Sequence, residues 1–244
     1  MARVGVMDMR NVVLRQSLVA CLVLSFAVPG TFAKPESPRS ESIVSGRSNI
    51  VFEENAGQFP AAVRYLARAG GFNIFLTNTE AVYVLPMENG PAAADVDRPT
   101  SRRAHALRMR FAADDRSVST IPSNAVEQTA NYFIGSDENA WRSNITNYRQ
   151  VDITNVSDGI DIRWHALANG GLQYDFIVSP GADSERAQLT FEGADSFDID
   201  ADGGLLIATP AGTIRQARPF TYQDDDNGQR VEVPSSFRID DDVV

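Results

Sequence analysis

Residues 160–178 read IDIRWHALANGGLQYDFIV. Apolar Ile160, Ile162 and Trp164 alternate with charged or polar residues, and after an Asn-Gly-Gly turn signal the alternation resumes at Leu172. Alternation with a period of two places successive side chains on opposite faces of a strand. A short Gly-rich connection joins antiparallel neighbours. The stretch therefore predicts a β-hairpin with one face on a core and the other in water.

The same pattern recurs along the chain. Residues 105–111 and 188–192 also alternate, and turn signals such as Ser-Pro-Gly at 179–181 separate the runs. Only 60–69 and 124–130 look compatible with brief helices. Because two short helices are too few to alternate with so many strands, we expect an all-β fold, an antiparallel β-sandwich-like domain.

Composition excludes several classes of function. The 244 residues are 43% hydrophobic, which is enough for a sizeable core, and carry 32 acidic against 22 basic residues for a net charge of −10. This is the wrong sign for a nucleic-acid binder. One cysteine and two histidines are too few for a zinc finger or an iron–sulfur cluster. We expect no cofactor.

Residues 1–33 have the features of a secretory signal peptide. The positive n-region contains Arg3, Arg10 and Arg15. The apolar run 18–28 is shorter than the roughly 20 residues of a spanning helix, and small residues precede a cleavage point after Ala33. We therefore expect a cleaved leader, a mature chain without a transmembrane anchor, and a secreted or cell-surface location. Residues 18–21 also match a lipoprotein signal at Cys21, but Arg15 leaves too little apolar chain before it.

The mature chain is expected to have two parts. Residues 34–49 are rich in Ser, Pro and Arg and predict a disordered lead-in. Residues 50–244 form the predicted β-rich domain, in which 90–103 is a polar, Pro-containing loop.

One group of polar residues is a candidate site. Asp161, Arg163 and His165 share the polar face of one predicted strand, and Asp175 lies on the polar face of the next. One interpretation is a binding or acid–base site with Asp161 and Asp175 as the working carboxylates. The other is a cross-strand ladder of ion pairs. No nucleophile motif supports catalysis, so the ladder is favoured.

Two further motifs have structural interpretations. Asp198, Asp200 and Asp202 match the first half of a calcium loop, but Thr209 occupies the position of the bidentate Glu, which favours a turn with an acidic edge over a metal site. Residues 55–58, Asn-Ala-Gly-Gln, suit either a polar recognition loop or a turn that uses the freedom of glycine, and the turn is favoured. His105 lies on the same face of its predicted strand as apolar Leu107, so we expect it at the edge of the core.

Several blocks together resemble a known family. They are FEENAGQ at 52–58, NYFIG at 131–135, the segment 141–148, GIDI at 159–162, YDFIVSPGAD at 174–183 and PFTYQ at 219–223. In this order they resemble a secreted bacterial domain of unknown function that lies N-terminal to SBBP-type β-propeller repeats in cell-surface proteins. The family often has Lys at the position of Ala56 and Glu at that of Gln173.

The resemblance implies export, a β-rich fold and a surface role, and it transfers no catalytic residues. Because family members usually continue beyond a segment like 237–239, the domain is expected to be truncated at its C-terminus. We therefore expect a non-catalytic structural or interaction module, the N-terminal part of a larger surface protein, with surface proteins or glycans as partners. The alternative is a carbohydrate-binding or carbohydrate-cleaving domain that uses Asp161, Asp175 and rings such as Trp141, Trp164 or Tyr148.

Overall fold

A computed structural model describes residues 2–5, 18–27, 50–69, 71–87, 103–111, 118–167, 171–225 and 227–240, with 2–5 and 18–27 described by their backbone alone. Of the predicted segments, 34–49 and almost all of the loop 90–103 lie outside these residues.

The described residues form strands joined by turns and two short 3-10 turns. The strands are β1 (Ala2–Gly5), β2 (Leu18–Ala27), β3 (Phe52–Glu54), β4 (Tyr65–Ala69), β5 (Phe72–Leu76), β6 (Glu80–Pro86), β7 (Ala104–Arg110), β8 (Ser119–Tyr132), β9 (Arg142–Ser157), β10 (Ile160–Ala166), β11 (Leu172–Val178), β12 (Gln188–Glu192), β13 (Ser196–Ile199), β14 (Leu205–Thr209), β15 (Gly212–Gln216), β16 (Phe220–Asp224), β17 (Arg230–Val233) and β18 (Arg238–Asp240). The 3-10 turns are η1 (Glu138–Ala140) and η2 (Ser184–Arg186).

Strand β9 joins two series of strands, and every recorded pairing is antiparallel. One series runs from β9 through β3, β4, β5, β6, β7, β12 and β1 to β18. The other runs from β9 through β10, β11, β2, β15 and β14 to β13, with β16 and β17 branching from β2. The prediction of an all-β, antiparallel fold is confirmed.

Both series contribute to one buried core. The Trp164 and Tyr174 rings lie 4.9 Å apart across β10 and β11. The Tyr174 hydroxyl donates to Gln216 Oε1 of β15 at 2.9 Å, and the Tyr83 hydroxyl of β6 lies 3.7 Å from the sulfur of Met109. The two buried tyrosine hydroxyls are therefore paired, whereas Trp164 Nε1 has no hydrogen-bond partner among the described residues.

The hairpin predicted over 160–178 is present as β10 and β11, with Arg163 opposite Asp175. The predicted inward residues Ile160, Ile162, Trp164 and Tyr174 are fully buried. His105 also has its expected place, since its Nε2 lies 2.6 Å from the Gly193 carbonyl oxygen. Alternation therefore identified the core face of these strands correctly.

The brief helices considered at 60–69 and 124–130 are wrong. Residues 65–69 form β4, and 124–130 lie inside β8. Each segment gains its hydrogen bonds from a neighbouring strand, β5 for the first and β9 for the second. Tertiary pairing overrides the weak local helix preference of residues such as Ala and Glu.

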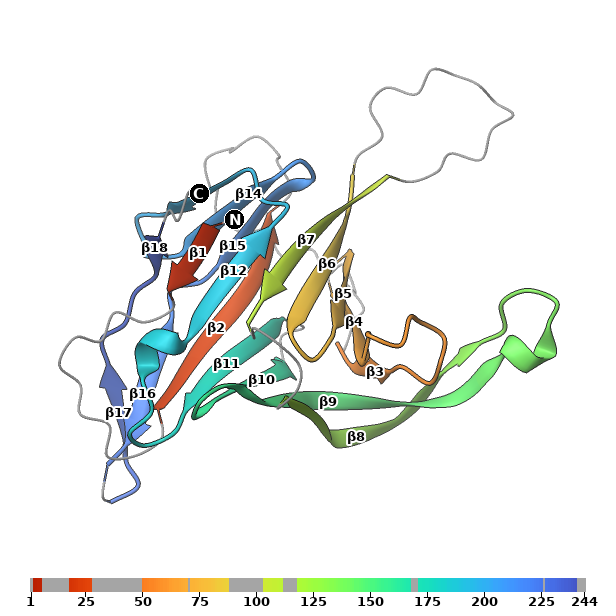
Figure 1. Cartoon of the computed structure of the whole chain (residues 1–244), viewed down its shortest axis with the longest axis horizontal. Coiled ribbons are helices and arrows are strands. Elements are labelled where there is room, and N and C mark those ends of the chain that lie inside the picture. The colour runs from red at the N-terminus through yellow and green to blue at the C-terminus, as the bar shows by residue number, and fades with distance from the viewer. Residues whose placement is uncertain are drawn as a thin grey trace, which may run out of the picture.

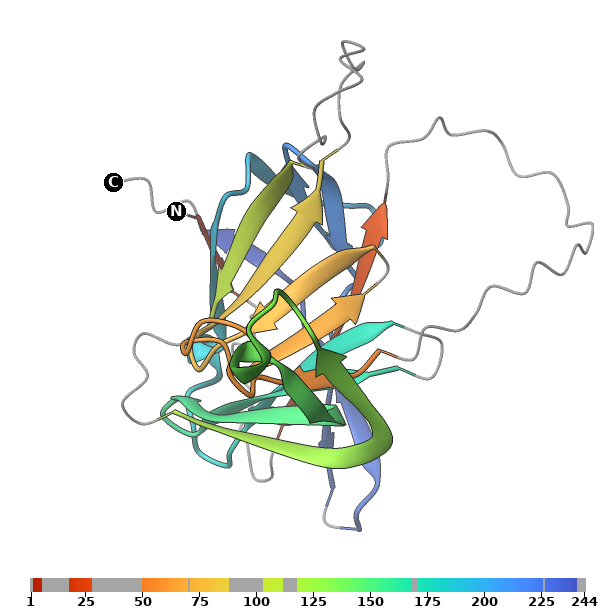
Figure 2. The same cartoon turned by 90° about the vertical axis from the view of Figure 1, so that its right-hand side faces the viewer.

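Strands β8 and β9 form an arm that extends away from the rest of the molecule (Figure 1), and in Figure 2 it points toward the viewer. The pairing runs from Ser119 opposite Thr154 to Tyr132 opposite Arg142, with register shifts after Val126. Asn124, Asn144 and Asn155 have φ values of 56° to 59° along the arm. Asparagine tolerates this left-handed region better than most residues, so the two strands can be irregular without glycine.

Strand β2 occupies a central position in the second series. One of its edges pairs with β11, and the other pairs with β15 and then β16. These are the residues in which the sequence predicts the apolar run of a leader. Cleavage of 1–33 stays a prediction.

Candidate functional site

The polar face of β9, β10 and β11 carries a ladder of paired side chains, which we define as Gln150, Asp152, Arg163, His165, Gln173 and Asp175. The Arg163 guanidinium donates to both carboxylate oxygens of Asp152, at 2.9 and 3.2 Å. The hydrogen bond to Asp152 raises the pKa of Arg163. The ladder thus has two adjacent hydrogen-bonded groups on three neighbouring strands, one of Gln150, Asp152 and Arg163 and the other of His165, Gln173 and Asp175.

Asp175 is the most buried charged member of the ladder, only 6% exposed. Its Oδ2 lies 3.1 Å from His165 Nε2, and its Oδ1 accepts from Gln173 Nε2 at 2.6 Å. A buried carboxylate needs such partners to compensate its loss of hydration. The sequence missed the burial of Gln173 and Asp175, because alternation alone places them on a wet face.

Asp161 belongs to a different set of contacts. Its Oδ1 accepts from the Asn155 amide at 2.8 Å, beside the irregular pairing of β10 with β9. In the β10–β11 register Asp161 lies opposite Ile177, and Asp175 lies opposite Arg163. The two carboxylates therefore have separate partners.

The calcium candidates surround a β-turn. Asp200 Oδ1 accepts from the amides of Asp202 and Gly204 at 2.9 and 2.8 Å, and its Oδ2 lies 2.6 Å from Arg215 Nε. The hydrogen bond from Arg215 lowers the pKa of Asp200, and the amide of Gly204 adds to this effect. Asp198 accepts from the next amide along the chain. Within the described ranges, no three His, Cys, Asp or Glu side chains gather as a metal site would require.

The loop after β3 is organised around Asn55. Its Nδ2 donates to the carbonyls of Phe59, Pro60 and Val63, and its Oδ1 accepts from the amides of Gly57 and Phe59. Gly57 has φ +102°, a conformation that side-chain-bearing residues rarely adopt. These contacts match the turn interpretation of 55–58.

A hollow of about 670 Å³ opens beside this loop. Its lining includes Glu54, Asn55, Arg64, Tyr65, Asn78 and Thr120. The Tyr148 hydroxyl lies 3.4 Å from Glu54 Oε2, and the Tyr65 and Tyr148 rings meet edge to face at 6.0 Å. Burial, with a contribution from Glu54, raises the pKa of Tyr65 to about 12. Three residues of the FEENAGQ block, Glu54, Asn55 and Gly57, thus line a hollow that Tyr65 borders.

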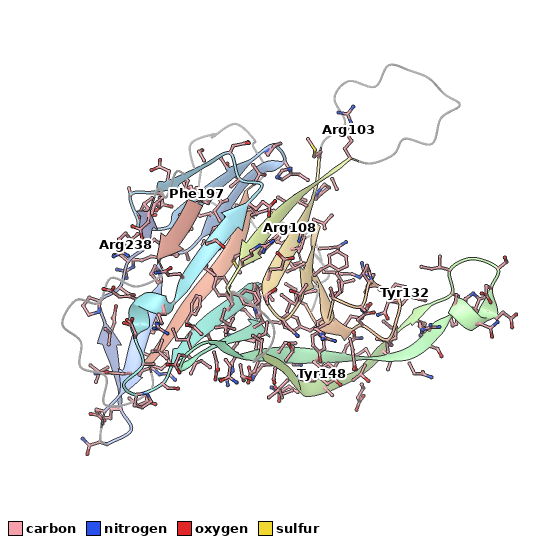
Figure 3. The ribbon with its side chains drawn as sticks, viewed as in Figure 1. Arg103, Arg108, Tyr132, Tyr148, Phe197 and Arg238 are labelled. Atoms are coloured by element: carbon pink, nitrogen blue, oxygen red, sulfur yellow. The ribbon has the colours of Figure 1, made fainter. Side chains whose placement is uncertain are left out.

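Near its outer end, the arm is fastened to the same loop. The Tyr132 hydroxyl donates to Glu53 Oε1 and accepts from Arg68 Nη2 at 2.7 Å. The Phe59 ring packs edge to face on Tyr132 at 5.7 Å. Figure 3 labels Tyr132 beside this loop and Tyr148 farther along β9.

The arm ends in a tip that we define as residues 133–141. Phe133 is 62% exposed and Ile134 is 72% exposed, and the ring of Trp141 packs edge to face on Phe133 at 5.4 Å. Trp141 Nε1 donates to the Gly135 carbonyl at 3.2 Å, which ties the two ends of the tip together. Sequence reasoning cited Phe133 and Ile134 only as part of a resembling block. Two adjacent apolar residues before a polar Gly-Ser-Asp-Glu turn were the signal for an exposed tip.

The three aromatic residues considered for sugar stacking differ in their exposure to solvent. Trp164 is fully buried in the core. Trp141 is 36% exposed, and Tyr148 is partly covered by Tyr65. Of these three rings, Trp141 and Tyr148 are thus accessible to a ligand, and Trp164 is not.

In the part of the chain that the structure describes, no helix is long and apolar enough to cross a membrane.

Comparison with known proteins places the chain in a family. No curated protein and no solved structure matches it significantly. A family model, described as a domain of unknown function (DUF7948), matches residues 52–244, which include the loop after β3, the ladder and the whole arm. The chain belongs to this family, the domain of unknown function DUF7948.

Proposed function

We propose that the chain is an exported, non-catalytic interaction module of the cell surface, in which the arm tip contacts a partner protein. The proposal includes the cleaved leader, the β-sandwich-like arrangement of the two strand series and the association with SBBP repeats in a larger surface protein. The observation that carries it is the exposed apolar pair Phe133–Ile134 at the end of the arm.

The tip has the chemistry of a protein contact. A neighbouring pair of large apolar side chains held in water is unfavourable unless another surface covers it. Phe133 and Trp141 form a preordered aromatic pair, and aromatic residues dominate the energetic centres of protein interfaces. The acidic Asp137 and Glu138 border this pair, which favours a partner with an apolar hollow and a basic rim.

The ladder supports a structural role for the polar face. Asp152 and Asp175 each have a cationic or histidine partner, and Asp161 binds a backbone amide. Such pairing across strands contributes to the sheet and requires no substrate.

The test uses a photo-crosslinking amino acid in place of Ile134 in intact cells that export the protein. We expect a discrete adduct with one envelope protein, and we expect the Phe133→Ser substitution in the same chain to abolish it. A crosslinker at Ile121 is the matched control, because Ile121 is 53% exposed on the same β8 strand but lies outside the tip. Equal crosslinking from Ile121 and Ile134, or none from Ile134, contradicts the proposal.

A carbohydrate-binding function is the second candidate, and the hollow beside Glu54 and Tyr65 favours it. Carboxylate and amide groups in one open hollow suit the hydroxyls of a sugar ring. Calorimetric titration with neutral and anionic oligosaccharides tests this function, with Glu54→Gln as the hollow variant and Asp161→Asn/Asp175→Asn as the ladder variant. Loss of binding in one variant alone assigns the ligand to that site, and no binding by the parent protein rejects this candidate.

A further inference from the structure

Strand β2 lies between strands that do not pair with one another. Ten residues, Leu18–Ala27, pair with β11 on one edge. The other edge pairs with β15 at residues 24–27 and with β16 at residues 18–21. All three neighbours run antiparallel to β2.

Removal of a leader that ends at Ala33 takes this strand out of the sheet. The backbone groups of β11, β15 and β16 that pair with β2 then lose their partners along two facing edges. Unpaired edges of this kind recruit other strands, because each buried amide or carbonyl without a hydrogen bond is costly. We call the space between these edges the strand slot.

The backbone register also indicates which residue types suit each face of the slot. On the face that points into the core, the buried Tyr174 and Leu172 of β11 lie opposite positions 22 and 24 of β2, which are both leucine. On the other face of the sheet, Asp175 and Gln173 of β11 lie opposite positions 21 and 23 of β2, which are the apolar residues Cys21 and Val23. These two β11 residues belong to the polar ladder, so a strand with alternating polar residues matches this face better.

A second observation comes from the β16 edge. Gln223 lies opposite Leu18 in the register. Among the residues that the structure describes, its Oε1 is one of the few buried side-chain oxygens without a hydrogen-bond partner. A leucine at the facing position offers no side-chain donor, whereas a Thr, Asn or Lys there offers one.

We propose that the strand slot is an acceptor site for an extended segment of a partner polypeptide, which replaces residues 18–27 after the leader is removed. The segment runs antiparallel to β11 and spans about ten residues. It has apolar residues at alternate positions with polar residues between them, and a further polar residue opposite Gln223. Recognition of this kind draws affinity from main-chain hydrogen bonds and specificity from alternate side chains. This inference rests on the export part of the proposed function and does not involve the arm tip.

The test begins with the full chain, expressed with its own N-terminus and exported by a bacterial host. Intact mass measures whether the product begins at Lys34. The probe is a synthetic peptide with the sequence of residues 16–29 and the substitutions Leu18→Asn, Val19→Thr, Cys21→Lys and Val23→Thr. A peptide of the same composition, scrambled so that the alternation is lost, is the control. An Ala33→Arg variant, which blocks cleavage because the last leader position needs a small residue, keeps its own β2.

Hydrogen exchange is the readout. We expect the probe to slow exchange at least about tenfold at amides of 172–178, 212–216 and 220–223 in the cleaved protein. The scrambled peptide and the uncleaved variant are expected to show no such change. If the cleaved chain is unfolded by circular dichroism, recovery of its β-sheet signal on addition of the probe supports the same conclusion.

Three results overturn the inference, and they are distinguishable. An exported product that retains residues 18–27 leaves no vacant slot and also contradicts cleavage of the leader. If the probe does not slow hydrogen exchange in the cleaved product, the acceptor site is overturned, whereas the proposed surface function is not contradicted. A cleaved product that forms a dimer with these amides already protected assigns the slot to a second copy instead of a different partner.

Discussion

His165 Nε2 lies 3.1 Å from Asp175 Oδ2, and the pair joins β10 to β11 on the polar face of the sheet. Gln173 completes the surroundings of the same carboxylate at 2.6 Å. This is a local arrangement of three side chains around one buried negative charge. Because His165 and Gln173 hydrogen-bond to Asp175, this carboxylate can be buried even though the sequence pattern places it on the polar face of β11.

The first prediction concerns the removal of this charge. Asp175→Ala leaves the Gln173 amide and His165 without their shared acceptor, so the free energy of unfolding is expected to fall by about 1–3 kcal/mol. Urea denaturation measures the change. Glu127→Ala on exposed β8 is the control, with an expected change near zero. Equal stability of the Asp175→Ala and parent proteins would show that the ladder contributes nothing to the fold.

The second prediction concerns acid and the turn at Asp200. Arg215 lowers the pKa of Asp200 below its ordinary value of 3.8. A carboxyl whose pKa is lower in the folded state stabilises the fold fully above its unfolded pKa, and this stabilisation is lost as the pH falls through the folded value. The difference in melting temperature between the parent and Asp200→Asn should therefore be constant above about pH 5 and disappear in stronger acid.

Asp202→Asn is the matched control for this titration. Asp202 Oδ2 lies 3.7 Å from Arg215 Nη2, and its side chain is 89% exposed. An exposed pair at this distance contributes little. A pH profile for Asp202→Asn as steep as that for Asp200→Asn would contradict the assignment of the effect to the Asp200–Arg215 contact.

The third prediction concerns the fastening of the arm. Tyr132→Phe removes the hydroxyl that bridges Glu53 and Arg68, and we expect the arm to open more often and the protein to lose about 0.5–1.5 kcal/mol. Faster hydrogen exchange in 126–132 and 142–148 measures the opening. Unchanged exchange there would show that strand pairing alone holds the arm.

The same tyrosine has a pH signature. Burial, followed by the hydrogen bond with Glu53, raises the pKa of Tyr132 from 10.0 to about 12. A group whose pKa is higher in the folded state stabilises the fold fully below its unfolded pKa. The stability difference between the parent and Tyr132→Phe should thus be constant below pH 10 and decrease as the pH rises toward 12. A stability difference between the two proteins that grows from pH 10 to 12 would contradict the raised pKa of Tyr132.

The fourth prediction separates backbone strain from a steric clash at two glycines. Gly181 and Gly193 have φ values of +81° and +91°, but a Cβ on Gly181 meets nothing within 4 Å, whereas one on Gly193 lies 2.5 Å from the Ala106 carbonyl oxygen. Gly181→Ala should cost about 1–2 kcal/mol from its left-handed conformation. Gly193→Ala should cost clearly more, because β7 must also move. Thermal unfolding of the two variants compares them, and equal losses would exclude the clash.

Local sequence determined much of the fold. Alternation around Trp164 and Tyr174, together with the Asn-Gly-Gly sequence at 169–171, predicted the β10–β11 hairpin and its buried face, because a period of two is a property of the strand itself. The same reasoning placed His105 at the core edge. Local sequence also placed Asp175, the partner of His165, on the neighbouring strand, but it missed Asp152, which pairs with Arg163 from β9.

Tertiary structure decided the rest. The burial of Asp175, the strand conformation of 124–130 and the exposure of Phe133 depend on which distant strands lie beside them, and no local pattern encodes those neighbours. The place of residues 18–27 is the clearest case. Their apolar composition suits a leader, but only the sheet shows that their backbone lies between β11 and the β15–β16 edge, because hydrogen bonding between strands is a long-range property of the chain.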